Sequence, residues 1–227
     1  MWPQILHFWL KTSMAKTTVP VVVIGAGGHA RVLAEAITAC GLRLAGHVAP
    51  GADSSGLLGP HLGDDSRLSW LAAKGYPLAI GLGFVDAAGA ERRAYLLVGL
   101  AAMGAVLASV VHPAAFLSPS ARLEDGCFLA AGSIVGTLSH IGRGCIINSG
   151  AVLDHDAEIG ENCHIATGAR LAGGVVLGRD VLIGAGAVLR QGLQIGAGAV
   201  VGAGAVVIRS VPAGVTVVGN PAQERRT

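Results

Sequence analysis

Two different patterns of apolar residues divide the chain near residue 110. From Val111 onward, a leucine, isoleucine or valine recurs every six residues until Val207, and a small or apolar side chain stands four positions after each one. Neither an α-helix, with its period of 3.6, nor a simple alternating strand produces a period of six. The pattern therefore predicts a parallel β-solenoid, in which each hexad supplies one short strand and one corner, and three hexads complete a coil of about 18 residues.

Residues before this point follow the pattern of a small α/β domain. Four aliphatic residues at 21–24 predict a buried parallel strand, and the glycine-rich turn after it leads into a helix at about 29–40. Further strands are expected at 44–48 and near 77–81, with a second helix at about 87–103. These elements predict a Rossmann-like βαβαβ domain of about three or four strands, too short for a complete six-stranded nucleotide fold.

We accordingly divide the chain into four parts. They are an N-terminal extension (1–18), a Rossmann-like domain (19–108), a β-helix domain (109–222) and a C-terminal tail (223–227). The chain begins MWPQILHFWLKTSMAK, whose apolar part is too short to span a bilayer and lacks a small-residue cleavage site. We treat this extension as peripheral, with Met14 as a candidate translation start, and expect a cytoplasmic protein without membrane insertion.

Solenoid geometry predicts where the polar residues of the second half lie. Because residues 18 apart stack on adjacent coils, His155 and Asp156 fall on a corner, and Gly173 lies directly one coil above His155. His164 points outward from the face opposite that corner, and Asn148 lies on the same face one coil earlier. His155 and His164 therefore cannot share a site within one chain. They would meet only across a subunit interface, as a threefold assembly of three-sided prisms supplies.

Two interpretations of His155 are open. It is either a solvent-exposed corner histidine or a general base whose ring is oriented, and made more basic, by the adjacent Asp156. The Gly173 amide stacked beside it would then stabilise an oxyanion. Asp154 is a rival partner, but it precedes the corner on a strand position, so Asp156 is preferred. These residues together indicate acyl transfer to an amine or a hydroxyl.

The glycine-rich turn of the first domain indicates a second binding site. Backbone amides of Gly27 and Gly28 at the start of a helix favour a phosphate or diphosphate. The run Gly-Ala-Gly-Gly-His is not the full dinucleotide fingerprint. Ala49-Pro50 also follows the second strand where a ribose-binding acid would be expected, so we do not expect NAD to bind.

Composition and spacing exclude several other classes of function. A net charge of +2 gives no nucleic-acid signature. Three cysteines, at 127, 145 and 163, are spaced by 18 on the inward small position, and we interpret them as a reduced core column rather than a metal or disulfide device. The histidines at 140, 155 and 164 do not have the spacing of the zinc ligands of γ-class carbonic anhydrases, which use the same solenoid, so no metal is predicted.

The motifs of both halves, in their order, resemble one family of bacterial enzymes. The residues that carry the likeness are GAGGHARV (25–32), LGDD (62–65), VHPAAFLSPSA (111–121), INSGAVLDHD (147–156), HIATGARLAGG (164–174) and VVGNPA (217–222). This set is similar to the sialic-acid O-acetyltransferase-like group that includes the bacillosamine and perosamine N-acetyltransferases. The resemblance implies a left-handed β-helix, an exception to the right-handed crossover rule, without a break over 111–222.

The resemblance also implies substrates and residue roles. In that family, residues 19–108 would hold a nucleotide-activated sugar, and the β-helix would hold acetyl-CoA between the subunits of a homotrimer. The residue matching His155 is the general base, with the match of Asp156 as its partner, while the matches of His164 and Gly173 contact the thioester end. Asn148, on the same face as His164, is a further candidate cofactor-binding residue. The matches of Gly27, Gly28 and His29 line the sugar nucleotide.

Two parts of this correspondence stay open. The segment Gly219-Asn220-Pro221 either closes the solenoid as a plain turn or, as the resemblance implies, lies along the CoA arm. The family's aspartate after the second strand is absent, and Gly81-Leu82-Gly83 replaces its usual Gly-Asp-Asn. These departures leave the recognition of the nucleobase unassigned.

We therefore expect an acetyl-CoA-dependent N-acetyltransferase acting on the C4 amine of a UDP- or GDP-linked amino-dideoxy sugar. The alternative is O-acetylation of a sugar hydroxyl, such as that of a sialic or related nonulosonic acid, because the same base would serve. Two other classes are disfavoured: a metal-dependent hydratase by the histidine spacing, and a non-catalytic sugar-nucleotide-binding scaffold by the His155–Asp156 pair.

Overall fold

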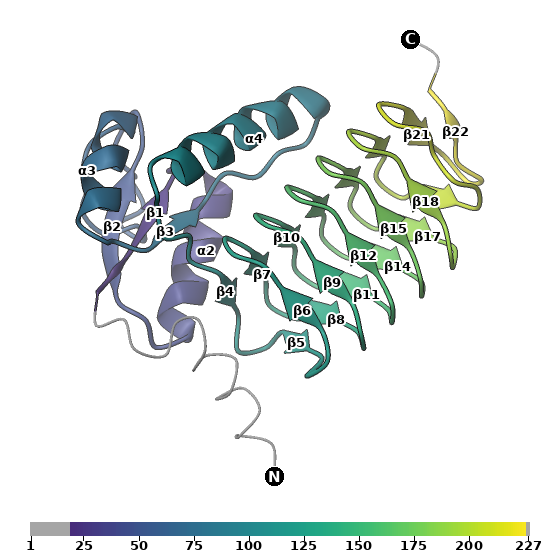
Figure 1. The fold of residues 1–227 in the computed structure, drawn as a ribbon, viewed down its shortest axis with the longest axis horizontal. Coiled ribbons are helices and arrows are strands. Elements are labelled where there is room, and N and C mark those ends of the chain that lie inside the picture. The colour runs from purple at the N-terminus through teal and green to yellow at the C-terminus, as the bar shows by residue number, and fades with distance from the viewer. Residues whose placement is uncertain (1–18, 226–227) are drawn as a thin grey trace.

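The N-terminal domain is a three-stranded parallel sheet flanked by helices (Figure 1). The structure, a computed structural model, describes residues 19–225, so the predictions for residues 1–18 and for Met14 lie outside the described residues. The strand order is β2-β1-β3, with β1 at Val21–Ile24, β2 at Leu44–Val48 and β3 at Leu78–Ile80. All three predicted strands are confirmed, and β1 is central because it pairs with both β2 and β3; all four of its residues are buried.

Helices cover this sheet and extend toward the second half of the chain. They are α2 (Gly28–Ala39), the short 3₁₀ helix η1 (Asp65–Arg67), α3 (Leu68–Ala73) and α4 (Ala87–Ala102). The two predicted helices correspond to α2 and α4. In Figure 1, α4 begins beside the coils of the second half and runs back toward the N-terminal sheet.

The second half is a parallel β-helix with three sheets, as its period of six predicts. The eight-stranded sheet contains β4 (Val110–Val111), β7 (Phe128–Leu129), β10 (Ile146–Ile147), β13 (His164–Ile165), β16 (Leu182–Ile183), β19 (Val200–Val201), β21 (Thr216–Val218) and β22 (Gln223–Glu224). The six-stranded sheet contains β5 (Phe116–Leu117), β8 (Ile134–Val135), β11 (Val152–Leu153), β14 (Arg170–Leu171), β17 (Val188–Leu189) and β20 (Val206–Val207). The five-stranded sheet contains β6 (Arg122–Leu123), β9 (His140–Ile141), β12 (Glu158–Ile159), β15 (Val176–Leu177) and β18 (Gln194–Ile195).

Stacked residues fill the interior of the prism, which explains the hexad pattern. Neighbouring coils pair in a register of 18, for example Ile147 with Ile165, and these aliphatic side chains are fully buried. The cysteine column is buried as expected, with all three thiols free. Each thiol lies near a backbone carbonyl of the following coil, for example Cys145 Sγ at 3.0 Å from the Gly160 oxygen. The column therefore serves as core packing.

The spacing changes in the last coil, beyond Val207, where the six-residue pattern ends. Val211 bridges Ile195, and Val217 pairs with Val201, so the spacing between stacked residues is 16 there instead of 18. A continued six-residue step from Val207 would have placed the small Ala213 inward. Val211 fills the interior better, and its side chain is buried.

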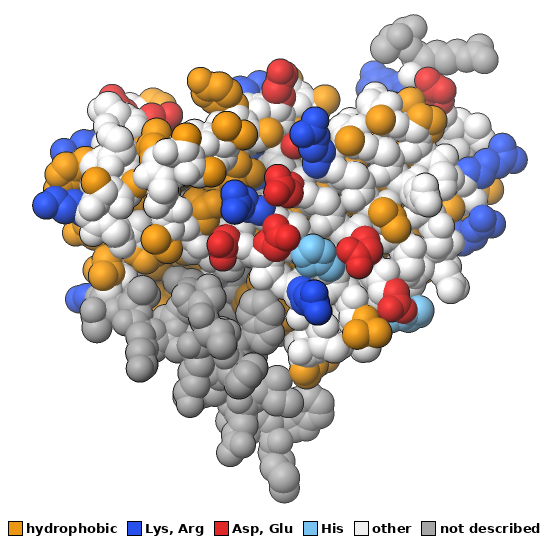
Figure 2. Space-filling view, in the orientation of Figure 1, with side chains coloured by type: hydrophobic (Ala, Val, Ile, Leu, Met, Phe, Trp, Pro, Cys, Tyr) orange, Lys and Arg blue, Asp and Glu red, His pale blue; other side chains and the backbone are white. Residues whose placement is uncertain are grey.

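The two domains share a packed apolar contact. Val110, Phe128 and Ile146 point outward from the first coils of the eight-stranded sheet and pack in one buried cluster with Leu33 and Ile37 of α2. Figure 2 shows charged side chains gathered over this junction on the visible face. The outward residues of the eight-stranded sheet are therefore partly covered by the chain's own first domain.

Among residues 19–225, no helix combines the length and the apolar character that crossing a membrane requires.

Candidate active site

The glycine-rich turn opens toward the junction between the domains. Gly27 is the N-cap of α2 and provides no side-chain hydrogen bond to the helix, and no acidic residue stands in the first turn. Gly27 and Gly28 are exposed, and a Cβ added at either would meet nothing within 4 Å. The end of β3 lies close by, because Gly81 has no side chain: a Cβ there would lie 2.8 Å from the Ala30 Cβ. This helix start is therefore accessible to a ligand.

A cavity of about 640 Å³ lies between this turn and the eight-stranded sheet. It brings together the residues predicted to bind the sugar nucleotide with two of those predicted to bind the cofactor. From the N-terminal domain it is lined by Gly27, Gly28, His29, Val32, Arg92 and the segment 81–86, and from the β-helix by Asn148, Ser149, His164 and Thr167. One chain therefore supplies both groups of residues to one cavity.

The hydrogen bonds of His164 determine its tautomer. Its Nδ1 lies 2.8 Å from the carbonyl oxygen of Phe84, and a carbonyl only accepts, so Nδ1 carries the hydrogen. Nε2 then accepts from the Asn148 side-chain amide at 3.3 Å, whose oxygen accepts from the Ser149 N–H at 2.8 Å. Burial lowers the pKa of His164, so the ring is neutral near pH 7.

His29 lines the same cavity. Its ring centroid is 5.5 Å from that of Phe128 and 6.3 Å from that of His164. Burial, followed by the charges of His164 and Arg93, lowers the pKa of His29 to about 3. Its buried Nε2 has no hydrogen-bond partner among the described residues. A neutral imidazole with an unpaired nitrogen is suited to receive a polar group of a ligand.

Sequence reasoning missed a buried polar cluster beside this cavity. Arg93 of α4 is only 2% exposed, and its Nε donates to the Leu82 carbonyl at 2.8 Å. Its Nη1 donates to the Gly144 carbonyl and to the Asn162 side-chain oxygen. A signal was available, because Arg93 occupies a core position of the buried stripe of α4, which also contains Ala90, Leu97 and Leu100.

His155 and Asp156 form the predicted pair on their corner. Nδ1 of His155 and Oδ2 of Asp156 are 2.7 Å apart, and the hydrogen bond raises the pKa of His155. Asp154 also contributes, because its carboxylate accepts from the His155 N–H at 2.8 Å and its charge further raises that pKa. Asp156 has a φ of 56°, so the corner bends through a left-handed residue. Both side chains are about half exposed in the single chain.

Gly173 lies against the His155 ring, as the 18-residue spacing predicts. A Cβ at position 173 would be 2.5 Å from both Cε1 and Nε2 of His155. The next amide, that of Gly174, donates to the His155 carbonyl at 2.9 Å. Only glycine therefore fits beneath the ring in this position.

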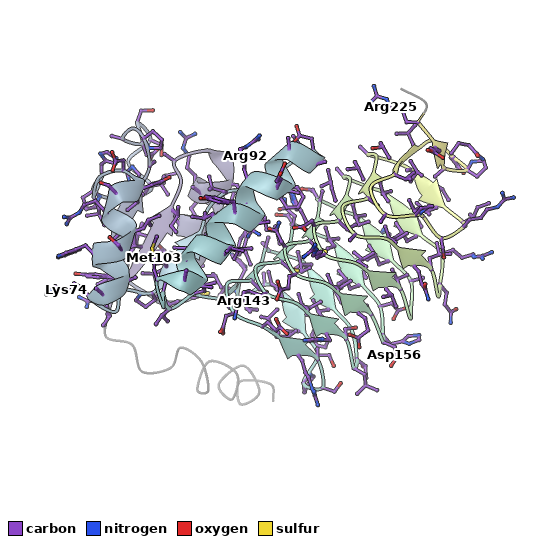
Figure 3. The ribbon with its side chains drawn as sticks, turned by 45° about the horizontal axis from the view of Figure 1, so that its top comes forward. Lys74, Arg92, Met103, Arg143, Asp156 and Arg225 are labelled. Carbon is purple, nitrogen blue, oxygen red and sulfur yellow. The ribbon has the colours of Figure 1, made fainter. Side chains whose placement is uncertain are left out.

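His155 and the cavity lie on different edges of the prism. The corner of His155 joins β11 of the six-stranded sheet to β12 of the five-stranded sheet, whereas His164 belongs to the eight-stranded sheet. Figure 3 shows Asp156 at the edge of the β-helix, away from α4 and its labelled Arg92. His155 does not line the cavity of its own chain. The expected separation of His155 and His164 within one chain agrees with this arrangement.

The segment Gly219-Asn220-Pro221 forms the turn between β21 and β22, which pair antiparallel. The Asn220-Pro221 bond is cis. In Figure 1 this turn lies at the end of the β-helix farthest from the N-terminal domain. It closes the solenoid, and it does not line the cavity described above.

Metal ligands are not gathered anywhere in the described part of the chain. Among residues 19–225, no group of three or more histidine, cysteine or acidic side chains is arranged to hold a metal ion. His140, the third histidine of the β-helix considered for zinc, contacts Glu124 and Glu158 on the five-stranded sheet.

Comparison with known protein families covers both domains. Residues 20–86 match the family described as the PglD N-terminal domain. Residues 139–173 and 174–209 match the bacterial transferase hexapeptide family, and residues 121–155 match the hexapeptide repeat of succinyl-transferase. The curated proteins contained no match.

Solved structures give closer likenesses. The structure of PerB from Caulobacter crescentus, in complex with CoA and GDP-perosamine, is 38% identical with a TM-score of 0.83, covering 92% of this chain and 99% of that chain. A mutant perosamine N-acetyltransferase from the same organism, with one histidine replaced by asparagine, is 37% identical over 93% of this chain and 99% of that chain, also at 0.83. The acetyltransferase domain of PglB from Neisseria gonorrhoeae, in complex with acetyl coenzyme A, is 33% identical with a TM-score of 0.81, covering 91% and 98%.

Proposed function

Because this chain belongs to the PglD-like sugar acetyltransferases, with their left-handed hexapeptide-repeat β-helix, we propose that it acetylates the C4 amine of a nucleotide-linked amino-dideoxy sugar. The chain is an acyltransferase, and acetyl-CoA is the proposed acetyl donor. Support for the acceptor class comes from the Caulobacter crescentus relative, whose structure holds CoA and GDP-perosamine. UDP- and GDP-linked sugars are both candidates.

The observation that carries the chemistry is the hydrogen bond between His155 and Asp156. With Nδ1 donating to the carboxylate, Nε2 is left as the basic atom, and the raised pKa strengthens it as a base. As the sugar amine attacks the thioester carbonyl, Nε2 of His155 takes the proton from the nitrogen. The carbon–sulfur bond then breaks, and the proton passes to the departing CoA sulfur.

Gly173 is the proposed source of oxyanion stabilisation. Within residues 19–225 its N–H donates to no backbone carbonyl, and it lies beneath the ring of the proposed base. An amide in this place would donate to the oxygen on which negative charge develops when the amine attacks.

The two halves of the site would come from two chains of a homotrimer. The six-stranded sheet lies between the corner of His155 and the corner of Asn148 and Ser149, which borders the cavity. Its outward residues form an apolar stripe interrupted by one arginine: Phe116, Ile134, Val152, Arg170, Val188 and Val206. If this sheet faces a threefold axis, each His155 corner approaches the cavity of the next chain.

Binding roles follow from this arrangement. The amides of Gly27 and Gly28, with the unpaired Nε2 of His29, would hold the sugar nucleotide. Asn148 and His164 would contact the thioester end of acetyl-CoA where it enters from the subunit interface. The turn at 219–221 is the proposed contact for the rest of the CoA arm. The turn lies at the end of the β-helix farthest from the N-terminal domain (Figure 1), so this proposal requires an extended cofactor. The cytoplasmic location expected from the sequence stays a prediction.

The proposed function is tested by CoA-thiol release from acetyl-CoA with a panel of UDP- and GDP-linked 4-amino-4,6-dideoxy sugars and their 4-hydroxy counterparts. We expect rapid turnover of one amino sugar by the wild type and its loss in His155→Ala. His140→Ala is the matched control, because His140 is an exposed histidine of the β-helix outside the site. Turnover of hydroxyl sugars alone would replace the proposal with O-acetylation. No turnover of any acceptor by protein that binds acetyl-CoA would reject the acceptor class.

A further inference from the structure

Arg93 is a buried cation at the junction between the domains, and its partners are neutral. It is 2% exposed and forms no ion pair with any residue of the described chain. Its guanidinium instead donates to the carbonyl of Leu82, the carbonyl of Gly144 and the side-chain oxygen of Asn162. Burying a charge is costly unless it is both paired with an opposite charge and hydrogen-bonded, and a leucine would fill the same position on the stripe of α4. The arginine therefore requires an explanation beyond packing.

The partners of Arg93 show what it joins. Gly144 and Asn162 are 18 residues apart, so they occupy the same corner on two successive coils of the β-helix. Asn162 donates in turn to the Ala90 carbonyl of α4 at 2.9 Å and to Asp180, on the next coil, at 2.7 Å. Arg93 and Asn162 thus connect α4 to three stacked corners of the solenoid.

The third bond of Arg93 reaches the wall of the cavity. Leu82 lies two residues before Phe84, whose carbonyl accepts the Nδ1 hydrogen of His164. Between them, Gly83 lies against the ring of His29: a Cβ at Gly83 would be 3.5 Å from the His29 Cγ. The segment 82–84 is therefore held by Arg93 at one end and bonded to His164 at the other.

We propose that Arg93 is a positioning residue: by fixing the segment 82–84 against the β-helix, it holds His164 in the Nδ1–H tautomer, with Nε2 directed to Asn148 and the cavity. The proposal rests on the proposed function for its kinetic consequence alone. Its structural consequence, the orientation of the His164 ring, is a property of the protein without substrates.

The charge of Arg93 acts in the same direction as its geometry. It lowers the pKa of both His164 and His29, after the larger effect of burial. His164 is also faced by His29 from α2 and by the Phe84 carbonyl from the cavity wall, and the hydrogen bond to that carbonyl raises its pKa. Replacing Arg93 by a neutral residue should therefore raise the pKa of His164, whereas lysine at this position should largely preserve it.

Two variants separate geometry from charge. Arg93→Lys retains a cation but loses the planar fork that reaches three oxygens at once. Arg93→Met retains an extended side chain but loses both charge and donors. Arg122→Met is the matched control, since Arg122 is exposed on the five-stranded sheet. The His164 ring is followed by nitrogen-15 NMR of the histidines without ligands, with His164→Gln identifying its signals.

We expect the wild type and Arg122→Met to show the Nδ1–H form of His164, and both Arg93 variants to show a mixture of tautomers. With acetyl-CoA and the active acceptor, kcat should fall by about 100-fold in Arg93→Lys, the size of effect that a misplaced site residue produces. Asn162→Ala should reduce kcat similarly, and the double variant Arg93→Lys/Asn162→Ala should be little worse than either single one, because both break one network.

The proposal is overturned if Arg93→Lys keeps the wild-type tautomer of His164 and changes kcat by less than about twofold. A variant that is less stable but keeps both properties has lost only packing, which also overturns it. If Arg93→Met does not fold, Arg93→Lys decides alone. If the wild type transfers no acetyl group, the proposed function fails, while the tautomer measurement still decides the role of Arg93.

Discussion

At the scale of single residues, the candidate base is held from three directions. Asp156 binds Nδ1 of His155, Asp154 binds its backbone N–H, and Gly173 leaves space against the face of the ring. The hydrogen bond to Asp156 and the charge of Asp154 raise the pKa of His155. The third contact is steric. One substitution at each neighbour therefore measures what that neighbour contributes to the position or the pKa of the His155 ring.

Gly173→Ala should displace the His155 ring without disturbing the coil. The added Cβ would lie 2.5 Å from Nε2, and the ring must move, whereas the backbone at 173 has no positive φ that alanine would strain. We expect kcat to fall by about 100-fold, with little change in thermal stability. Gly51→Ala is the control, because a Cβ there meets nothing within 4 Å. Unchanged kcat in Gly173→Ala would mean that the ring position is unimportant.

Asp156→Asn should move the pH dependence of acetyl transfer. The hydrogen bond to Asp156 is the largest cause of the raised pKa of His155, so its loss brings that pKa back toward 6.5. Because the base is active when deprotonated, the acidic limb of the kcat profile should shift to lower pH, while the maximal kcat falls. Rates of acetyl transfer measured from pH 5 to 9 check this prediction. If the acidic limb does not move in Asp156→Asn, it reports the titration of a group other than His155.

At the scale of elements, the six-residue period by itself predicts nearly the whole β-helix. Each predicted inward aliphatic residue from Leu129 to Val207 is buried, because only one face of each short strand meets the interior. The period could not predict the shorter step from Val207 to Val211. At that point side-chain volume, rather than spacing, decides which residue fills the interior. Nor could the period show that the outward His164 is covered, since its cover comes from Phe84 in the other domain.

The apolar face of the six-stranded sheet leads to a prediction about assembly. Ile134 and Val188 are each 40% exposed on this face. Glutamate at either position should place a charge on the proposed threefold contact and shift the protein from trimer to monomer, as measured by light scattering after gel filtration. Val176→Glu is the matched control, because Val176 is 41% exposed on the five-stranded sheet. If all three variants assemble equally, the contact between subunits does not lie on the six-stranded sheet.

At the scale of the whole molecule, a site shared between chains predicts complementation. His155→Ala lacks the base but keeps its cavity, and His164→Gln keeps the base but alters the cavity. When the two inactive proteins are unfolded, mixed equally and refolded, about a quarter of the sites should combine one intact base with one intact cavity. Activity should therefore return to about that fraction of wild type. No recovery in mixed trimers would mean that each site lies within one chain.

The sequence by itself determined the fold of both halves and the pairing of His155 with Asp156 and Gly173. These features depend on short-range rules: burial repeats every six residues, and stacking every 18. Tertiary structure alone decided which residues cover the outward side chains of the solenoid. The bonds of Arg93 to Leu82 and Asn162 link positions up to 69 residues apart. No short-range sequence period predicts these hydrogen bonds, because they depend on how one domain packs against the other.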